Sequence, residues 1–283
     1  MLPPLVMSVM LTAMLLAPPE ILIHGHRGCR ALRPENTLPA FQHALKLGVD
    51  VLELDMAVTK DNQILVSHDP HISPKICRNW DGSALDAEVA IHSLTLQEAQ
   101  SYDCGAVQNP EYPKQVPVPH TPPPTLEQVF ELSKTNPKVQ FNIETKIFKE
   151  EPGLAPSPQK FAQLVVDAVR KHHLEQRVIV QSFDPRTLHE VRKIAPEIRL
   201  AVLSEDGVGY IELAKKLHAE IVSPRYTKLT PADVRRAHDL KMQVVPWTAN
   251  DEASWKTLVG MGVDAIITDD PEALARFLGR RKP

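Results

Sequence analysis

Short apolar runs rich in β-branched residues alternate with longer amphipathic segments along most of this chain. Such runs are typical of buried strands, and the segments between them repeat their apolar positions with the period of a helix. The pattern predicts strands over residues 21–23, 51–58, 139–144, 178–181, 198–203, 220–223, 242–245 and 265–268. The second strand continues into a further segment, 64–67, after the turn-like sequence Lys60-Asp61-Asn62.

The amphipathic segments predict helices over residues 37–47, 125–133, 161–171, 185–194, 208–217, 231–239, 253–261 and 271–278. Thr37 can cap the first helix and Gly48 can end it. Repeated strand–helix units imply parallel strands joined by right-handed crossovers. Eight units in about 260 residues predict an α/β fold, a closed (β/α)8 TIM barrel. A doubly wound open sheet is the alternative, but no Gly-x-Gly-x-x-Gly follows the first strand, which argues against a dinucleotide-binding version.

Residues 70–124 do not follow this alternation of strands and helices, which predicts a small insertion after the second strand. The stretch is proline-rich loop sequence around one expected helix at 95–102. Cys77 and Cys104 both lie in it, and a disulfide between them would restrain a segment of little periodicity. Two unrelated thiols are the alternative. The spacing of the three cysteines, Cys29 included, is not that of a zinc site.

Residues 5–17 form an apolar run at the N-terminal end. A helix that crosses a bilayer needs about 20 residues, so no stable membrane insertion is expected from this run. Its length fits the apolar region of a secretory signal, which makes 1–17 a candidate signal peptide ahead of one barrel domain at 18–283. No Lys or Arg precedes the run and Pro18-Pro19 follows it, so a true start at Met7, Met10 or Met14 is the alternative. The signal predicts a periplasmic or secreted protein, and its absence a cytoplasmic one.

The composition allows one large core and narrows the range of partners. Of the 283 residues, 43% are hydrophobic, and α/β barrels of this size fold as one domain. The formal net charge of -3 and the pI of about 6.5 argue against a general nucleic-acid binder, because such proteins are usually basic. No feature of the composition sets the oligomeric state.

Charged side chains gather where the apolar runs end, which in a parallel barrel is where active sites form. Glu53 and Asp55 lie two positions apart in the second strand, so they share a face and are roughly 6.6 Å apart along it. Two carboxylates on one buried face repel each other, and a divalent cation removes that penalty. Glu144, at the end of the next strand, is the expected third ligand, and an all-oxygen set suits Mg²⁺ or Ca²⁺. The alternative is an ordinary ion-paired cluster balanced by Arg27 and Lys146.

Two histidines follow neighbouring strand segments beside the expected metal. His26 comes directly after the first strand, and His68 follows the segment 64–67. Paired imidazoles can act as base and acid near neutral pH. Arg27 and Lys146 supply positive charge for an anionic oxygen. Together these groups describe a site for phosphoryl chemistry.

The sequence Arg-Pro-Glu-Asn-Thr at 33–37 is expected to be architectural. Glu35 and Asn36 can fix the loop on the barrel rim, and Thr37 can cap the following helix. Glu35 also lies close enough in the sequence to orient Arg27 or a histidine.

Six segments resemble the glycerophosphodiester phosphodiesterase family. In chain order they are HRGCRALRPENT, GVDVLELDMAVTKDNQILVSHDP, FNIETK, VIVQSFDP, VVPWTAND and GVDAIITDDP. They cover the barrel from Glu20 onward. One segment alone is a weak signal, but the ordered set is specific.

The resemblance implies a (β/α)8 barrel with an insertion after the second strand, one divalent cation and a small-molecule substrate. It implies these roles: metal ligands Glu53, Asp55 and Glu144; acid–base pair His26 and His68; phosphate-binding Arg27 and Lys146; and Trp247 on the wall that faces the glycerol. The family hydrolyses glycerophosphodiesters to glycerol 3-phosphate and an alcohol such as choline or inositol. The related phosphatidylinositol-specific phospholipases C suggest a cyclic phosphate intermediate. The alternative is a lipid phosphodiesterase similar to lysophospholipase D or sphingomyelinase D, while a non-enzymatic barrel would lack some of these residues.

Overall fold

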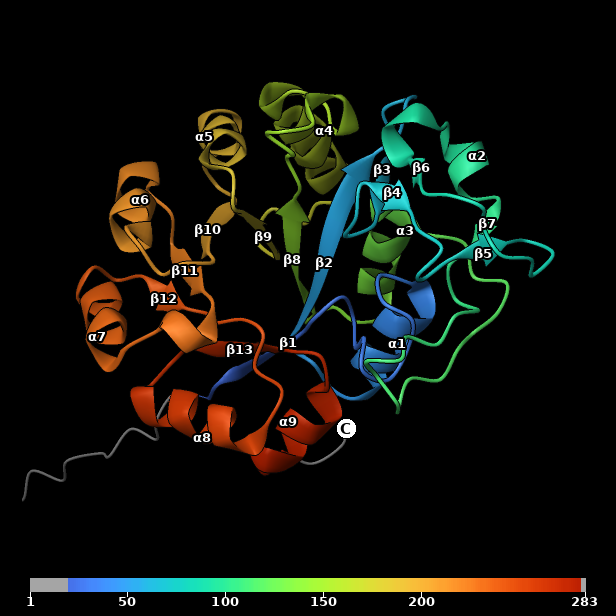
Figure 1. The fold of residues 1–283 in the computed structure, drawn as a ribbon. Coiled ribbons are helices and arrows are strands. Elements are labelled where there is room, and N and C mark those ends of the chain that lie inside the picture. Colours follow the sequence, from blue (N-terminus) through green and yellow to red (C-terminus); the bar gives the residue numbers. More distant parts are fainter. Residues whose placement is uncertain (1–19, 281–283) are drawn as a thin grey trace, which may run out of the picture.

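The computed structural model describes residues 20–280, so the candidate signal peptide at 1–17 lies outside the described residues. Within them, parallel strands form a barrel in the order β12-β11-β10-β9-β8-β2-β1-β13 (Figure 1). The strands are β1 (Leu22–Gly25), β2 (Val51–Val58), β8 (Gln140–Thr145), β9 (Val178–Ser182), β10 (Arg199–Ser204), β11 (Ile221–Pro224), β12 (Gln243–Val244) and β13 (Ala265–Thr268). Backbone hydrogen bonds from Asp264 to Val244 (3.0 Å) and from Ile267 to Pro246 (3.0 Å) close the barrel between its last two strands. The (β/α)8 prediction is confirmed, and the open-sheet alternative is wrong.

Helices surround the strands on the outside, as Figure 1 shows. They are α1 (Leu38–Lys46), α3 (Leu126–Glu131), α4 (Pro158–Lys171), α5 (Pro185–Ile194), α6 (Tyr210–Leu217), α7 (Pro231–Asp239), α8 (Glu252–Met261) and α9 (Pro271–Phe277). Short 3-10 helices lie at η1 (Ile91–Ser93), η2 (Leu132–Lys134), η3 (Pro152–Leu154) and η4 (Tyr226–Lys228). Capping residues set the helix starts: the Thr37 hydroxyl accepts from the Ala40 amide, as predicted. α6 begins at Tyr210 rather than at 208, because Gly209 is left-handed with φ 65°.

Two apolar layers fix which way each strand faces. The larger lies between the strands and the outer helices and includes Leu52, Leu54 and Met56 of β2. Glu53 and Asp55 alternate with these residues, so both carboxylates turn to the barrel interior. A smaller cluster fills the interior itself, with Ile179, Ala201, Ile221, Val245, Ala265 and Ile267. Burial of the outer face therefore holds the acidic pair on the inner face.

The insertion contains more regular structure than the sequence indicated. β3 (Ile64–Val66), a strand segment that the sequence predicts, pairs antiparallel with β2 ahead of the insertion. Inside the insertion, two small sheets, β4-β6 and β5-β7, are formed by β4 (His71–Ile72), β5 (Arg78–Asn79), β6 (Val89–Ala90) and β7 (Tyr102–Asp103). The helix expected at 95–102 is only α2 (Leu96–Ala99). A capping box of Thr95 and Glu98 starts it, and the chain turns into β7 directly afterwards. The Cys77–Cys104 disulfide is formed and lies in a small core of its own.

This disulfide should contribute several kcal/mol to the stability of the folded protein. It closes a loop of 27 residues, for which the chain-entropy relation gives about 3.5 kcal/mol. We expect the Cys77→Ser, Cys104→Ser double variant to lose about that much free energy of unfolding in urea denaturation. Dithiothreitol should lower the midpoint of the native protein and leave that of the double variant unchanged. An unaltered native midpoint under reduction would contradict the expectation. Disulfides persist in oxidising compartments, and on this ground we propose that the protein is exported, as the candidate signal peptide predicts.

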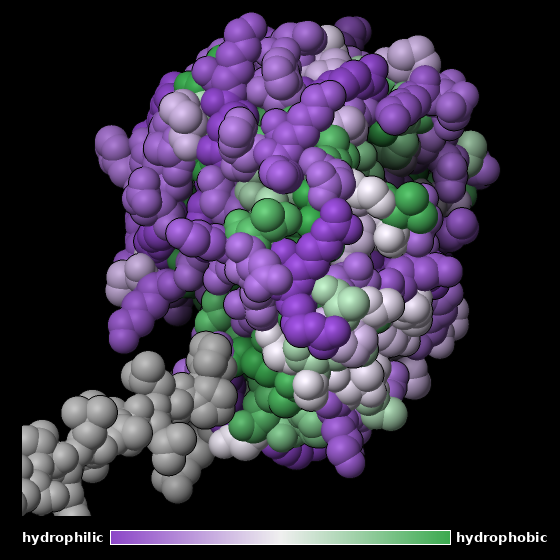
Figure 2. Space-filling view, turned by 90° about the vertical axis from the view of Figure 1, so that its left-hand side faces the viewer, coloured by the Kyte–Doolittle hydropathy of each residue, from purple (hydrophilic) through white to green (hydrophobic). Residues whose placement is uncertain are grey.

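The side of the barrel that carries α6 and α7 is mainly hydrophilic. Figure 2 shows polar side chains over most of this face, interrupted by hydrophobic areas near its centre and its lower part. Among residues 20–280, none of the helices is both long and apolar enough to cross a membrane.

Candidate active site

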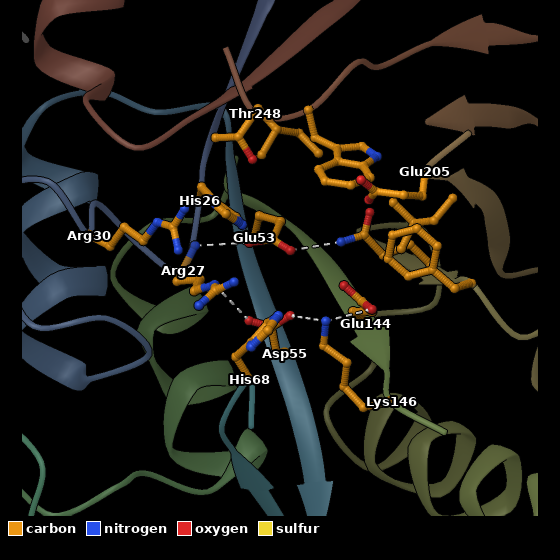
Figure 3. Close-up of a pocket in the computed structure, with 15 residues that line it drawn as sticks. His26, Arg27, Arg30, Glu53, Asp55, His68, Glu144, Lys146, Glu205 and Thr248 are labelled. Atoms are coloured by element: carbon orange, nitrogen blue, oxygen red, sulfur yellow. Dashed lines mark hydrogen bonds and ion pairs between the residues drawn. The ribbon is translucent and has the colours of Figure 1, made fainter. Parts of the chain in front are cut away.

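A cavity of about 230 Å³ opens at the carboxyl ends of the barrel strands (Figure 3). All of the site residues nominated from the sequence line it: His26, Arg27, Glu53, Asp55, His68, Glu144, Lys146 and Trp247. The remaining lining residues are Arg30, Gln181, Phe183, Leu203, Glu205, Thr248 and Ile267. The fold therefore brings together in one cavity residues from strands that are far apart in the sequence.

Three buried carboxylates form the centre of this cavity. Glu53 and Asp55 come from β2, and Glu144 stands on β8 directly beside Asp55 in the strand pairing. One oxygen of each lies within 4.8 Å of the others. Their exposed fractions are only 2%, 1% and 5%, so water does little to screen their mutual repulsion. The strand period and the β2–β8 register are what place these acids together.

The protein itself balances only part of this negative charge. Burial raises the pKa of Glu53, and the neighbouring Asp55 raises it further, to well above the usual range. Burial also opposes ionisation of Asp55, but Lys146 and Arg27 outweigh it and hold the pKa of Asp55 well below its usual range. The Lys146 ammonium lies 3.1 Å from Asp55 and 2.7 Å from Glu144. Burial raises the pKa of Glu144 as well. Glu53 thus has the least compensated carboxylate of the three.

The donor set fits a hard divalent cation. Carboxylate oxygens are the ligands that Mg²⁺ and Ca²⁺ prefer, and the three acids of this cavity each offer one oxygen within 4.8 Å of the others. Glu53 is also held in place, because Gln181 Nε2 donates to its Oε1 (2.7 Å) and the Arg27 amide to its Oε2 (2.9 Å). Ion pairs join Arg27 and Lys146 to Asp55 and Glu144, whereas among the described residues the one possible ionic partner of Glu53 is His26, whose Nε2 lies 4.0 Å from Glu53 Oε2. The alternative of a cluster balanced by Arg27 and Lys146 therefore fits Asp55 and Glu144 better than it fits Glu53.

A tight turn after β1 places Arg27 against these acids. Arg27 itself is left-handed with φ 48°, and Gly28 follows with φ 85°. A Cβ on Gly28 would lie 2.9 Å from Ala40, so only glycine fits there. The Arg27 guanidinium lies 2.6 Å from Glu35 and 3.3 Å from Asp55. The expectation that Glu35 orients Arg27 is confirmed.

Asn36 and Thr37 complete the architecture expected of residues 33–37. Asn36 Nδ2 donates to Asp55 Oδ2 at 3.0 Å, so the loop is fixed to the acidic group itself. The Thr37 hydroxyl donates to the carbonyl of Pro34 at 2.6 Å while it caps α1. The segment is therefore the scaffold on which the turn after β1 rests.

His26 is held by a carboxylate from the last strand. Its Nδ1 lies 2.6 Å from Asp269 Oδ1, in the residue that follows β13. Burial disfavours the charge on Asp269, but His26 and Arg30 reverse the effect and keep the pKa of this carboxyl below its usual range. An ionised carboxylate only accepts, so Nδ1 carries the proton and Nε2 is left free to accept one. Burial lowers the pKa of His26 to about 4 although Asp269 raises it, so the ring is neutral near pH 7.

His68 reaches the same cavity by way of the β2–β3 hairpin. β3 runs back along β2, and the amide of Ser67 donates to the carbonyl of Asp55 at 3.0 Å. His68 is the next residue, which places its ring beside the acidic group. Its Nδ1 lies 2.8 Å from Asp69 Oδ1, and its side chain is 36% exposed. The two histidines therefore share one arrangement, in which Nδ1 faces a carboxylate and Nε2 is the atom left for proton transfer.

One side of the cavity is apolar. Trp247 forms this side with Phe183, Leu203 and Ile267. The Trp247 indole donates to the carbonyl of Ser223 at 2.8 Å, and its ring meets that of Phe183 edge-on at 5.5 Å. A ring fixed in this way offers a rigid surface for the carbon skeleton of a ligand.

Comparison with known proteins agrees with this geometry. Residues 26–273 match the family described as the glycerophosphoryl diester phosphodiesterase family. The chain belongs to this family. The match begins at His26, directly after β1, and ends within α9, so nearly the whole barrel carries the family pattern.

The similarity to individual members of the family extends over most of each chain. A glycerophosphodiester phosphodiesterase of Caldanaerobacter subterraneus subsp. tengcongensis is 31% identical over 260 residues, which are 92% of this chain and 98% of that protein. A glycerophosphodiester phosphodiesterase of Bacillus altitudinis is 32% identical over 267 residues, which are 90% of this chain and 97% of that protein. A solved structure from Silicibacter pomeroyi that bears the family name superposes with a TM-score of 0.87 at 28% identity, and covers 93% of this chain and 94% of that one.

Three residues that support the family site were given no role from the sequence. Asp269 holds His26, Gln181 holds Glu53, and Arg30 donates to Asp269 through Nε (2.6 Å) and Nη2 (3.2 Å). Gln181 and Asp269 both stand at strand ends, which is the signal that could have found them. Arg30 lies in a loop, and no local pattern points to it.

Proposed function

We propose that this protein hydrolyses glycerophosphodiesters to glycerol 3-phosphate and an alcohol with the help of one divalent cation, Mg²⁺ or Ca²⁺. The observation that carries the proposal is that one cavity holds three convergent carboxylates, two histidines and two cationic side chains. Cleavage of a phosphodiester requires stabilisation of negative charge and the transfer of two protons. Membership of the family supports the same reaction.

The acidic side chains of the cavity would bind the metal ion, and the basic side chains would bind the phosphate. Glu53, Asp55 and Glu144 would hold the cation, which when bound polarises a phosphoryl oxygen. Arg27 and Lys146 line the same cavity and would bind the phosphate oxygens. Their positions are set by ion pairs to the acidic group, so they are oriented before the substrate arrives.

The two histidines would move the protons through Nε2. One ring takes the proton of a glycerol hydroxyl while that oxygen attacks phosphorus and a cyclic phosphate forms. The other ring gives its proton to the departing alcohol oxygen as the P–O bond breaks. Water then opens the ring with the two roles reversed, which restores both histidines and releases glycerol 3-phosphate. Asp269 and Asp69 hold Nδ1 of His26 and of His68 during these steps.

A panel of substrates tests the proposal. With Mg²⁺ or Ca²⁺ present, we expect glycerophosphocholine and its ethanolamine and inositol analogues to yield glycerol 3-phosphate and free alcohol in equal amounts. Coupled enzymatic detection of glycerol 3-phosphate measures the rate. Release of phosphocholine in place of choline would mean that the other P–O bond is cleaved. Faster turnover of lysophosphatidylcholine in vesicles would identify the lipid phosphodiesterase alternative instead.

A further inference from the structure

The carboxylate that holds His26 is itself held by three further side chains. Asp269 is only 2% exposed. Its carboxylate accepts hydrogen bonds from His26 Nδ1 (2.6 Å), the Arg30 guanidinium (2.6 and 3.2 Å), Asn250 Nδ2 (2.6 Å) and the Tyr112 hydroxyl (3.3 Å). A carboxylate offers about four lone-pair sites, so these donors leave it little freedom to rotate. The direction of the His26 ring thus depends on all of them.

Tyr112 is the one donor in this set that comes from the insertion. Its ring lies under the Arg30 guanidinium, with the guanidinium carbon 5.1 Å from the ring centre, while its hydroxyl reaches Asp269. Burial and the charge of Asp269 raise the pKa of the Tyr112 hydroxyl above its usual range, so it stays protonated and donates. Tyr112 therefore contacts Asp269 both directly and through Arg30.

The rest of the same loop is fastened to the barrel rim. Gln115 Nε2 donates to the carbonyls of Arg30 (2.6 Å) and Arg33 (3.2 Å), and the Val116 amide donates to Leu32 (3.0 Å). Lys114 lies 3.2 Å from Asp270. Residues 112–116 are therefore docked on the turn after β1 and on the residues after β13, the two segments that supply His26 and Asp269.

We propose that residues 112–116 of the insertion position His26 for proton transfer, with Tyr112 acting through Arg30 and Asp269. The inference rests on the proposed function, because it assumes that His26 exchanges a proton with the substrate. Tyr112 is not among the cavity-lining residues in the described part of the chain. It is thus a positioning residue, and its loss should slow turnover without weakening the binding of substrate.

Substitution of Tyr112 tests this proposal. We expect Tyr112→Leu to lower kcat for glycerophosphocholine roughly ten-fold, at the low end of what outer partners of site residues contribute, with KM changed by less than about two-fold. Tyr112→Phe keeps the ring on Arg30 and loses only the hydroxyl, so it should lose less. Trp80→Leu is the matched control, because Trp80 is an aromatic residue of the same insertion whose ring contacts that of His120, with the ring centres 5.5 Å apart. It should leave kcat unchanged.

A spectroscopic measurement separates this inference from the proposed function. The Nδ1 proton of His26, assigned in ¹⁵N-histidine-labelled protein by comparison with His26→Gln, should move upfield in Tyr112→Leu because its hydrogen bond to Asp269 loosens. Trp80→Leu should leave this resonance in place. The measurement needs no turnover, so it decides the matter even if glycerophosphodiesters prove not to be substrates. Tyr112→Phe, which keeps the ring on Arg30, should move the resonance by a smaller amount. An unmoved resonance in folded Tyr112→Leu, or a rise in KM with kcat retained, would overturn the proposal.

Discussion

Removal of divalent cations is expected to reduce glycerophosphodiester hydrolysis by at least about 10³-fold, the equivalent of roughly 4 kcal/mol of lost transition-state stabilisation. The reason is the balance of charge at Glu53, Asp55 and Glu144. Lys146 and Arg27 pair with Asp55 and Glu144, while burial and the neighbouring acids leave Glu53 poorly compensated. An anionic substrate would approach an acidic cluster that repels it, and a bound cation reverses that repulsion.

The measurement is turnover of glycerophosphocholine after dialysis against a chelator, followed by return of Mg²⁺ or Ca²⁺. Thermal unfolding gives a second readout, because a ligand at 100 times its Kd stabilises the folded state by about 2.7 kcal/mol. Asp55→Asn should lose both the activity and the cation-dependent rise in Tm. Lys171→Ala is a suitable control for a charge change outside the acidic cluster, because its side chain lies on α4, is 64% exposed and pairs with Glu127. Full turnover after exhaustive chelation would eliminate the metal from the mechanism.

The barrel could be predicted because its signal is local. Its strands are buried on both faces, so they read as nearly continuous apolar runs, and the predicted ends lie within two residues of the observed ones. The insertion lacks that signal. Its two-residue strands depend on contacts with distant residues, such as the Asp103 carboxylate, which accepts from the amides of His120 (2.6 Å) and Thr121 (3.1 Å). Pairing of this kind leaves no periodic trace in the sequence.

The site also combines features that a local sequence pattern predicts with contacts between residues far apart in the sequence. The meeting of Glu53, Asp55 and Glu144 follows from strand period and from the adjacency of two strands, both of which the sequence expresses. The contact between His26 and Asp269 spans 243 residues and exists because β1 pairs with β13 when the barrel closes. The predicted closed barrel made these two strands neighbours, but it did not indicate which of the residues after them would meet. Tyr112 reaches Asp269 from an irregular loop, and no rule of period or spacing predicts such a contact.

Loss of either histidine is the second large effect that we expect. His26→Ala or His68→Ala should lower kcat for glycerophosphocholine by about 10³-fold, within the range of general acid–base catalysis, with folding retained. Both rings line the cavity, and in both Nδ1 faces a carboxylate, so each variant removes one oriented Nε2. His189→Gln is the matched control, since that histidine lies on α5 with a 67% exposed side chain. Turnover near that of the native protein in either alanine variant would remove that residue from the mechanism.

A substrate with a better leaving group can show which of the two histidines acts as the base and which as the acid. In a glycerol phosphodiester of p-nitrophenol, the departing phenolate is stable without a proton, so the first step needs a base but no acid. The variant that lacks the acid should then recover much of its rate of p-nitrophenolate release, whereas the variant that lacks the base should stay slow. His26 has its pKa lowered to about 4 by burial and is neutral at pH 7, the form that accepts a proton. We therefore expect His68→Ala to be the variant that recovers. Recovery by His26→Ala instead would reverse the assignment, and recovery by neither would mean that both rings act before the P–O bond breaks.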